Sequence, residues 1–201
     1  MVNIHFRYGS TPLKDFPEEK KVFGGMLGGH VFIEINQIFY GFERGDEKSH
    51  HLFPRKKYNA DFKKESLEYF RESEKFNRMV SFEVKLNPSQ ELKLYSIVEE
   101  YHKKVPYDYA LFGMRCAAAT YHILSQIEFF PKTSKFRSFF LMPYPAFLRK
   151  RMFKIARQSK WEIKTQSGSE TRKWEKDSPT HILVNLCDFE TLWQKLGLLD
   201  G

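Results

Sequence analysis

The sequence contains few cysteines: Cys116 and Cys187 are the only two among 201 residues. A disulfide framework draws on a larger set, and a structural zinc site usually takes about four Cys or His ligands at close spacing. His50 and His51 are adjacent, so on a strand they would point apart, and no carboxylate-rich spacing accompanies them. We therefore expect two free thiols, with neither a metal nor another cofactor.

Long apolar runs are also missing. No window approaches the roughly 20 apolar residues that span a bilayer, and the first residues lack the basic, apolar and small-residue order of a secretory signal. No internal repeat and no low-complexity segment is present. These absences argue against a membrane-spanning helix and a repeat architecture, and we expect a cytoplasmic protein.

Aromatic side chains and positive charge, in contrast, are plentiful. Twenty Phe, ten Tyr and three Trp supply core material, and a chain of this length fits one domain that buries about 70% of its unfolded surface. The net charge of +8 favours anionic partners in general, but no nucleic-acid-binding motif accompanies it. We predict one α+β domain over residues 1–201 and no specific nucleic-acid partner.

The clearest local prediction is a β-hairpin near the N-terminus. Residues 30–35 and 38–43 are apolar or aromatic runs joined by an Asn-Gln pair, and Asn accepts the positive φ of a tight turn. With a two-residue turn, His30 faces Glu43 on the same side of the sheet. A longer turn would shift the pairing and bring Tyr40 or Phe42 closer to His30 instead.

Other segments alternate between strand and helix patterns. The polar and basic segment 45–58, which contains both adjacent histidines, predicts a surface loop, and Pro131 is expected to end the helix that carries Cys116. Cys187 is expected in the core. The predicted strands are 2–8, 78–86, 161–165 and 180–186, and the predicted helices are 61–76, one capped by Asn87 and Pro88, 115–129, 145–158 and 188–196.

The helix predicted over 145–158 is basic and amphipathic. Leu148, Met152 and Ile155 share one face, and Arg149-Lys150-Arg151 supply the charge. A helix of this kind either packs on its own domain with a solvated basic face or lies on an anionic membrane surface. The sequence leaves both possibilities open.

Cys116 stands where a run of small residues begins a helix. The positive end of a helix dipole and its unpaired N–H groups favour a thiolate, and a neighbouring imidazolium lowers the thiol pKa further. The thiolate is the nucleophilic form, and the same N–H groups can stabilise the oxyanion of a tetrahedral intermediate. Taken alone, Cys116 is more often a small buried hydrophobe, and His30 more often a structural or capping histidine. Their pairing favours a nucleophile and its base.

The two segments together resemble a known superfamily. Gly29-His30-Val31-Phe32-Ile33 with its hairpin, followed by Tyr107-Asp108-Tyr109 and then Cys116, is similar to the circularly permuted NlpC-type papain-like proteins, which include lecithin:retinol acyltransferase-like enzymes. The resemblance covers residues 24–45 and 105–128. It implies an α+β papain-like core in which an antiparallel sheet packs against the cysteine-bearing helix.

The resemblance also implies roles for individual residues. Cys116 would be the nucleophile, His30 the base, and a polar residue on the next strand would orient the imidazole. Glu43 is the first choice for that third residue, with Tyr40 or Glu34 as alternatives. Tyr107 and Tyr109 are expected in the core, from which one phenol can reach the site.

We therefore predict a thiol hydrolase that cleaves a peptide or isopeptide amide without a cofactor. A first alternative is a lipid-ester acyltransferase or hydrolase that works at a membrane surface through residues 145–158. A second alternative is a binding module of the same fold without catalysis, because three alanines follow Cys116 where relatives often carry Ser or Glu.

Overall fold

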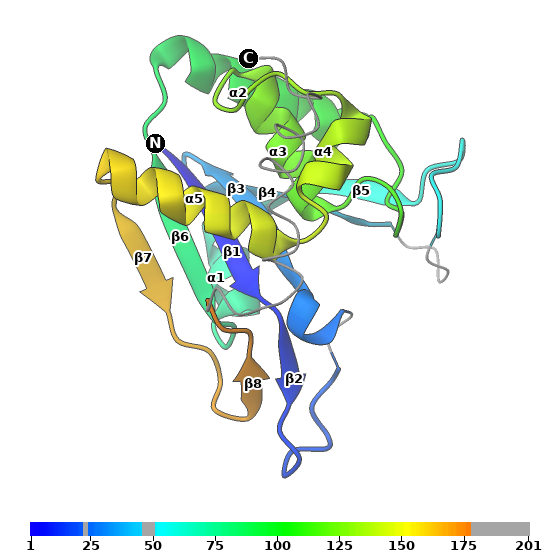
Figure 1. Cartoon of the computed structure of the whole chain (residues 1–201), viewed down its shortest axis with the longest axis vertical. Coiled ribbons are helices and arrows are strands. Elements are labelled where there is room, and N and C mark those ends of the chain that lie inside the picture. Colours follow the sequence, from blue (N-terminus) through cyan, green and yellow to red (C-terminus); the bar gives the residue numbers. More distant parts are fainter. Residues whose placement is uncertain (22–23, 46–50, 178–201) are drawn as a thin grey trace, which may run out of the picture.

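The computed structural model describes residues 1–21, 24–45 and 51–177, and its centre is a six-stranded antiparallel sheet. The strands follow the order β5-β4-β3-β1-β6-β7 across the sheet. A pair of short strands, β2 and β8, lies beside it (Figure 1). The strands are β1 (Val2–Tyr8), β2 (Ser10–Pro12), β3 (Gly29–Ile35), β4 (Ile38–Arg44), β5 (Ala60–Ser66), β6 (Met79–Val84), β7 (Ile163–Gln166) and β8 (Arg172–Trp174).

Helices cover both faces of the sheet. One face packs against α3 and α5, which contact β1, β3 and β4, and α1 lies behind the opposite face (Figure 1). The mixed α+β class predicted from the sequence is confirmed. The helices in the described ranges are α1 (Leu67–Glu74), α2 (Pro88–Lys103), α3 (Cys116–Gln126), α4 (Lys135–Leu141) and α5 (Pro145–Ser159), with a 3₁₀ turn, η1, at Gly25–Leu27.

The two faces of the sheet bury separate apolar clusters. Alternate residues of β3 divide between them, because successive side chains of a strand point to opposite faces. Val31 and Ile33 join the main cluster, which also contains the buried residues of α3 and α5. Phe32 joins a smaller cluster with Phe39 of β4 and Phe70 of α1. Which face a side chain occupies therefore decides which helix it meets.

The predicted hairpin is confirmed in position and register. Asn36 and Gln37 have φ values of 51° and 67°, the paired positive values of the two-residue turn that matches strand twist. Ile35 pairs with Ile38, and the ladder of β3 with β4 ends at Phe32 and Gly41. Beyond that pair, the first residues of β3 and the last residues of β4 are no longer paired with each other.

Local capping explains where α2 starts. Asn87 accepts a hydrogen bond from the Gln90 N–H, and the Gln90 side chain bonds back to the Asn87 N–H. This capping box, with Pro88 in the first turn, begins α2 where the sequence predicts it. One face of α2 is buried, with Leu94, Val98 and Tyr101 on it.

The prediction of a helix over 61–76 is wrong in its first half. Residues Ala60–Ser66 form β5, which pairs along its length with β4, and only Leu67–Glu74 are helical. Ser66 ends the strand and caps α1 by accepting a hydrogen bond from the Tyr69 N–H. Pairing with a neighbouring strand overrides the local helix pattern here.

The cysteine helix is shorter than predicted, and Pro131 does not end it. α3 ends at Gln126, Glu128 takes the left-handed φ of 60°, and the Phe129 N–H donates to the Leu124 carbonyl. A left-handed residue after the last turn is a common helix stop. The predicted strand 180–186, the predicted helix 188–196 and the predicted core residue Cys187 lie outside the described residues.

The sequence predicts no membrane-spanning segment, and each helix of the structure can be checked for the length and apolar character of such a segment. Among residues 1–21, 24–45 and 51–177, no helix combines the length and the apolar character needed to cross a bilayer.

Candidate functional site

Cys116 is the first residue of α3 and is almost fully buried. The N–H groups of Val31 and Ala117 are directed at its sulfur. Burial nevertheless raises the pKa of the Cys116 thiol to about 11, against the opposing effects of those two amides and of the positive charges on Arg115 and Arg7. The thiol is a protonated, neutral group at physiological pH in this structure.

His30 occupies the start of β3 and is buried as well. Its ring lies 4.5 Å from the Phe32 ring, centroid to centroid, and a side-chain carbon placed on Gly41 would sit 3.1 Å from its Nε2. Burial, with the nearby charges of Arg7 and Lys63, holds the His30 pKa well below its usual value. His30 is therefore neutral near pH 7, and the form present is the one that can accept a proton.

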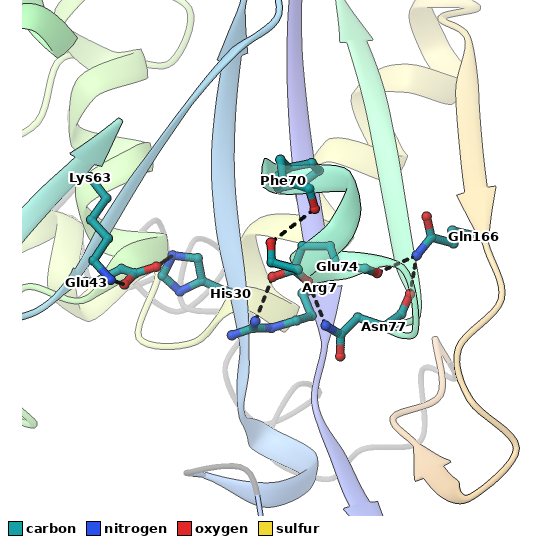
Figure 2. A network of polar contacts seen from close by, with 9 residues as sticks. Arg7, His30, Glu43, Lys63, Phe70, Glu74, Asn77 and Gln166 are labelled. Atoms are coloured by element: carbon teal, nitrogen blue, oxygen red, sulfur yellow. Dashed lines mark hydrogen bonds and ion pairs between the residues drawn. The ribbon is translucent and has the colours of Figure 1, made fainter. Parts of the chain in front are cut away.

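Glu43 lies beside His30 at the end of β4. Its Oε1 is 3.7 Å from His30 Nε2, and its Oε2 is 2.8 Å from the Lys63 ammonium group. Figure 2 shows the carboxylate between the imidazole and the ammonium group. Within the described residues, His30 Nε2 has no hydrogen-bond partner, because 3.7 Å is longer than a hydrogen bond. The structure thus brings His30 and Glu43 together without bonding them.

The two alternative third residues have other partners. The Tyr40 hydroxyl donates to Glu99 of α2. Glu34 accepts a hydrogen bond from Asn3 at 2.7 Å and contacts His5 Nε2 at 2.9 Å. Of the three carboxylate or phenol side chains considered from the sequence, Glu43 is the one placed at His30.

Cys116 and His30 lie near the same end of β3, the thiol on one face of the sheet and the imidazole on the other. Cys116 belongs to the main cluster with Val31, whereas His30 shares a face with Phe32. Among the described residues, His30 Nε2 makes no hydrogen bond to the thiol. The sulfur lies at the Val31 amide, just past the last β3–β4 pair, so the thiol and the imidazole flank the point at which these two strands separate.

The face of the sheet that carries His30 also carries an ion pair between a half-buried arginine and a buried carboxylate. Arg7 of β1 contacts Glu74 of α1 at 2.9 Å, and Asn77 donates to the same carboxylate (Figure 2). Burial raises the Glu74 pKa, with Arg7 opposing it. Arg7 therefore contributes a fixed positive charge close to both His30 and Cys116, which favours their neutral and anionic forms respectively.

Two tyrosines predicted in the core line this region. Tyr109 is close enough to Cys116 and Glu43 for their negative charges to raise its pKa, after the larger effect of burial. The Tyr107 hydroxyl is buried and has no hydrogen-bond partner among the described residues. Tyr109 is thus the phenol that lies near the thiol, a relationship created by the loop before α3.

The prediction that His51 lies in a surface loop is wrong. His51 is 2% exposed, and its Nδ1 lies 2.6 Å from Asp108 Oδ2. The Asp108 carboxylate also accepts hydrogen bonds from the N–H groups of Arg55 and Asn59, and these contacts hold its pKa below the usual value against burial. A polar, basic segment was the available sequence signal, and it does not reveal a buried carboxylate contributed by a distant loop.

The residues that the structure describes contain no candidate metal-binding site. Their His, Cys, Asp and Glu side chains form no group of three or more that could hold a metal ion.

The basic helix predicted over 145–158 is present as α5, and its apolar face is buried. Leu148 and Met152 are fully inaccessible, and the helix packs on β1, β3 and α3. Arg149 is also buried, with its Nη2 3.0 Å from Glu175 Oε2 and its Cζ 3.9 Å from the centroid of the Tyr8 ring. In the structure the helix packs on its own domain through this apolar face.

Comparison with known proteins supplies no identification. No protein-family model matches the chain, and none of the curated proteins or solved structures matches it.

Proposed function

We propose that this protein is a cysteine hydrolase that cleaves an amide bond, with Cys116 as nucleophile and His30 as base on a papain-like core. The observation that carries the proposal is the placement of the thiol at the start of α3, with its sulfur at the Val31 amide, the residue after His30. Peptide and isopeptide amides are the proposed substrates, because the resembling superfamily acts largely on such bonds.

The proposed reaction has two steps. The Cys116 proton passes to His30 as the sulfur attacks the carbonyl carbon, and His30 then donates that proton to the nitrogen of the departing amine. Water next attacks the thioester and releases a carboxylic acid and the free thiol. The N–H groups at the start of α3 would stabilise the oxyanion, and Glu43 would orient the imidazole.

Catalysis requires a change from the resting geometry. The thiol pKa of about 11 must fall, and a ring nitrogen of His30 must reach the sulfur past the end of the β3–β4 ladder. Catalytic hydrogen bonds are often long in structures without substrate and tighten when it binds. The unpartnered, neutral His30 Nε2 is consistent with a base that waits for such a rearrangement.

A second candidate is a binding module that keeps the same fold without chemistry. The raised pKa of Cys116 and the missing hydrogen-bond partner of His30 Nε2 among the described residues favour it. The two candidates differ in one measurable property, namely whether Cys116 is acylated in a manner that depends on His30.

That property can be measured with p-nitrophenyl acetate and a mixture of peptide–aminomethylcoumarin amides, in a Cys187→Ser background. We expect acylation at Cys116 in the peptide map and release of the fluorescent amine. Amine release should fall by about 100-fold in Cys116→Ala and in His30→Ala, and acylation of Cys116 should fall by about as much in His30→Ala, in the range of general-base losses.

His122→Ala is the matched control. His122 is also a buried histidine whose pKa is lowered by burial, but it lies within α3 rather than at its start, so this variant should keep the activity. Equal acylation of Cys116 in the wild type and in His30→Ala, or no acylation of Cys116 by any of these reagents, would reject the hydrolase in favour of the binding module. Cleavage of the ester alone, dependent on His30, would move the substrate class from amides to esters.

A further inference from the structure

Two loops that precede β5 and α3 expose large apolar side chains. Leu52 is 56% exposed, Phe53 65% and Phe112 54%. The Phe53 and Phe112 rings stack with their centroids 5.3 Å apart, so the exposed groups form one cluster rather than scattered points. We call residues 51–59 and 108–114 together the two-loop platform. Clustered apolar exposure of this kind marks an interaction site, whereas single exposed apolar residues do not.

Backbone hydrogen bonds join the two loops directly below the exposed cluster. The Leu111 N–H donates to the His51 carbonyl at 2.9 Å, and the Phe112 N–H donates to the Leu52 carbonyl at 2.8 Å. Leu52 and Phe112, two of the three exposed apolar residues, are thus joined through their main chains. These bonds fix the backbone that carries both side chains.

The buried Asp108 adds a second tie. It belongs to one loop and accepts hydrogen bonds from three groups of the other, namely the His51 ring and the N–H groups of Arg55 and Asn59. Because these contacts already fix the two loops against each other, the loops lose little conformational entropy when a partner binds. This favours binding.

The platform is also basic. Arg55, Lys56 and Lys57 are exposed and follow the apolar tip within the same loop, and the whole chain carries a net charge of +8. Apolar and aromatic side chains can enter the acyl boundary of an anionic membrane, and cations beside them can contact its headgroups. Each Lys or Arg held near such a surface strengthens binding about fivefold at physiological ionic strength.

We propose that the two-loop platform docks this protein on an anionic phospholipid surface. Leu52, Phe53 and Phe112 enter the interface, and Arg55 and Lys56 contact the headgroups. The platform differs from the helix over 145–158 considered in the sequence analysis, whose apolar face is buried against β1, β3 and α3. The inference is independent of the proposed hydrolase, because it uses neither Cys116 nor His30.

The test is cosedimentation of the full chain with large vesicles of phosphatidylcholine, with or without phosphatidylserine. We expect the wild-type protein to sediment with the anionic vesicles and to stay in solution with neutral ones. The triple variant Leu52→Ser, Phe53→Ser, Phe112→Ser should bind the anionic vesicles at least about tenfold more weakly, since three large apolar side chains no longer enter the interface. Arg55→Glu with Lys56→Glu should weaken binding to a similar degree.

Matched controls separate the platform from general surface properties. Phe76→Ser with Leu92→Ser removes apolar side chains that are 67% and 73% exposed elsewhere on the protein, and this pair should bind as the wild type does. Lys93→Glu with Lys103→Glu makes the same charge change on exposed positions of α2, and we expect at most a small loss. Thermal unfolding of each variant verifies that it is folded.

Several results would overturn the proposal. These are no binding of the wild-type protein to anionic vesicles, undiminished binding of the triple variant, and equal losses in the platform and control variants. Sedimentation velocity without lipid distinguishes the competing occupant: a self-associated species that the triple variant abolishes, together with no vesicle binding, would assign the platform to a second copy of the chain.

Discussion

The Nδ1 atom of His51 lies 2.6 Å from Oδ2 of Asp108, and both side chains are almost completely buried. This contact ties the loop before β5 to the loop before α3, two segments more than fifty residues apart in the sequence. A buried carboxylate with three hydrogen-bond partners in this structure is expensive to replace, because its removal leaves donors without acceptors.

Asp108→Asn should therefore destabilise the protein by about 2–4 kcal/mol, since one amide oxygen cannot replace two charged acceptor oxygens. Urea unfolding near neutral pH measures the loss. Amide exchange should also accelerate at Arg55 and Asn59, whose N–H groups donate to Asp108. Asp15→Asn, at an exposed position, is the control, and equal stability of the two variants would contradict the structural role of Asp108.

His30 should make the stability of the protein depend on pH. Its pKa is well below its usual value in the folded state, so between that lowered pKa and about 6.5 the unfolded chain binds a proton that the folded chain does not. The free energy of unfolding then decreases as the pH falls from 7 towards 5, by up to about 1.4 kcal/mol per pH unit for one group. It recovers fully above the unfolded-state pKa.

Urea unfolding of His30→Asn at about pH 7 and about pH 5.5 tests this linkage. The variant should lose less stability between the two pH values than the wild type does, whatever its stability at pH 7. His122, whose pKa is also lowered, should retain its part of the slope. A wild-type slope in His30→Asn would show that His30 is not neutral when buried.

Gly41→Ala should disturb the His30 ring. A methyl group at this position would lie 3.1 Å from His30 Nε2 and 3.2 Å from Phe32 Cδ1, so one ring has to move. Crowding of this kind costs about 1–3 kcal/mol. We expect lower stability in urea and shifted imidazole resonances of His30, with the His51 resonances unchanged as an internal control. Unshifted His30 resonances would mean that the ring does not cover Gly41.

The ion pairs of Arg149 should hold α5 against the segment around β8. It lies 3.0 Å from the buried Glu175 and 3.1 Å from Asp177. Arg149→Met leaves the Glu175 carboxylate buried without its cation, which costs about 3–5 kcal/mol. Lys150→Met, one residue along on an exposed position, should have little effect. Adding Glu175→Gln to Arg149→Met should recover part of the loss; without recovery, the ion pair is not the cause.

Local sequence signals predicted much of the framework. The hairpin register follows from a two-residue turn and a period-two pattern, and the start of α2 follows from Asn87 and Pro88. These features depend on residues within a few positions of one another, so neighbouring side chains suffice to specify them. The contact of His30 with Glu43 belongs to this group, since the register alone brings both to one face.

The sequence by itself determined the α+β class, the hairpin and the position of Cys116 at a helix start, because backbone propensity and short-range hydrogen bonds encode them. Only the tertiary structure decided which face of β3 each group occupies and how deeply it is buried. Packing placed Cys116 and His30 on different faces, raised the thiol pKa, turned residues 60–66 into an added strand, and buried His51 on Asp108. Such outcomes depend on segments far apart in the chain, where long-range pairing and desolvation outweigh the local pattern.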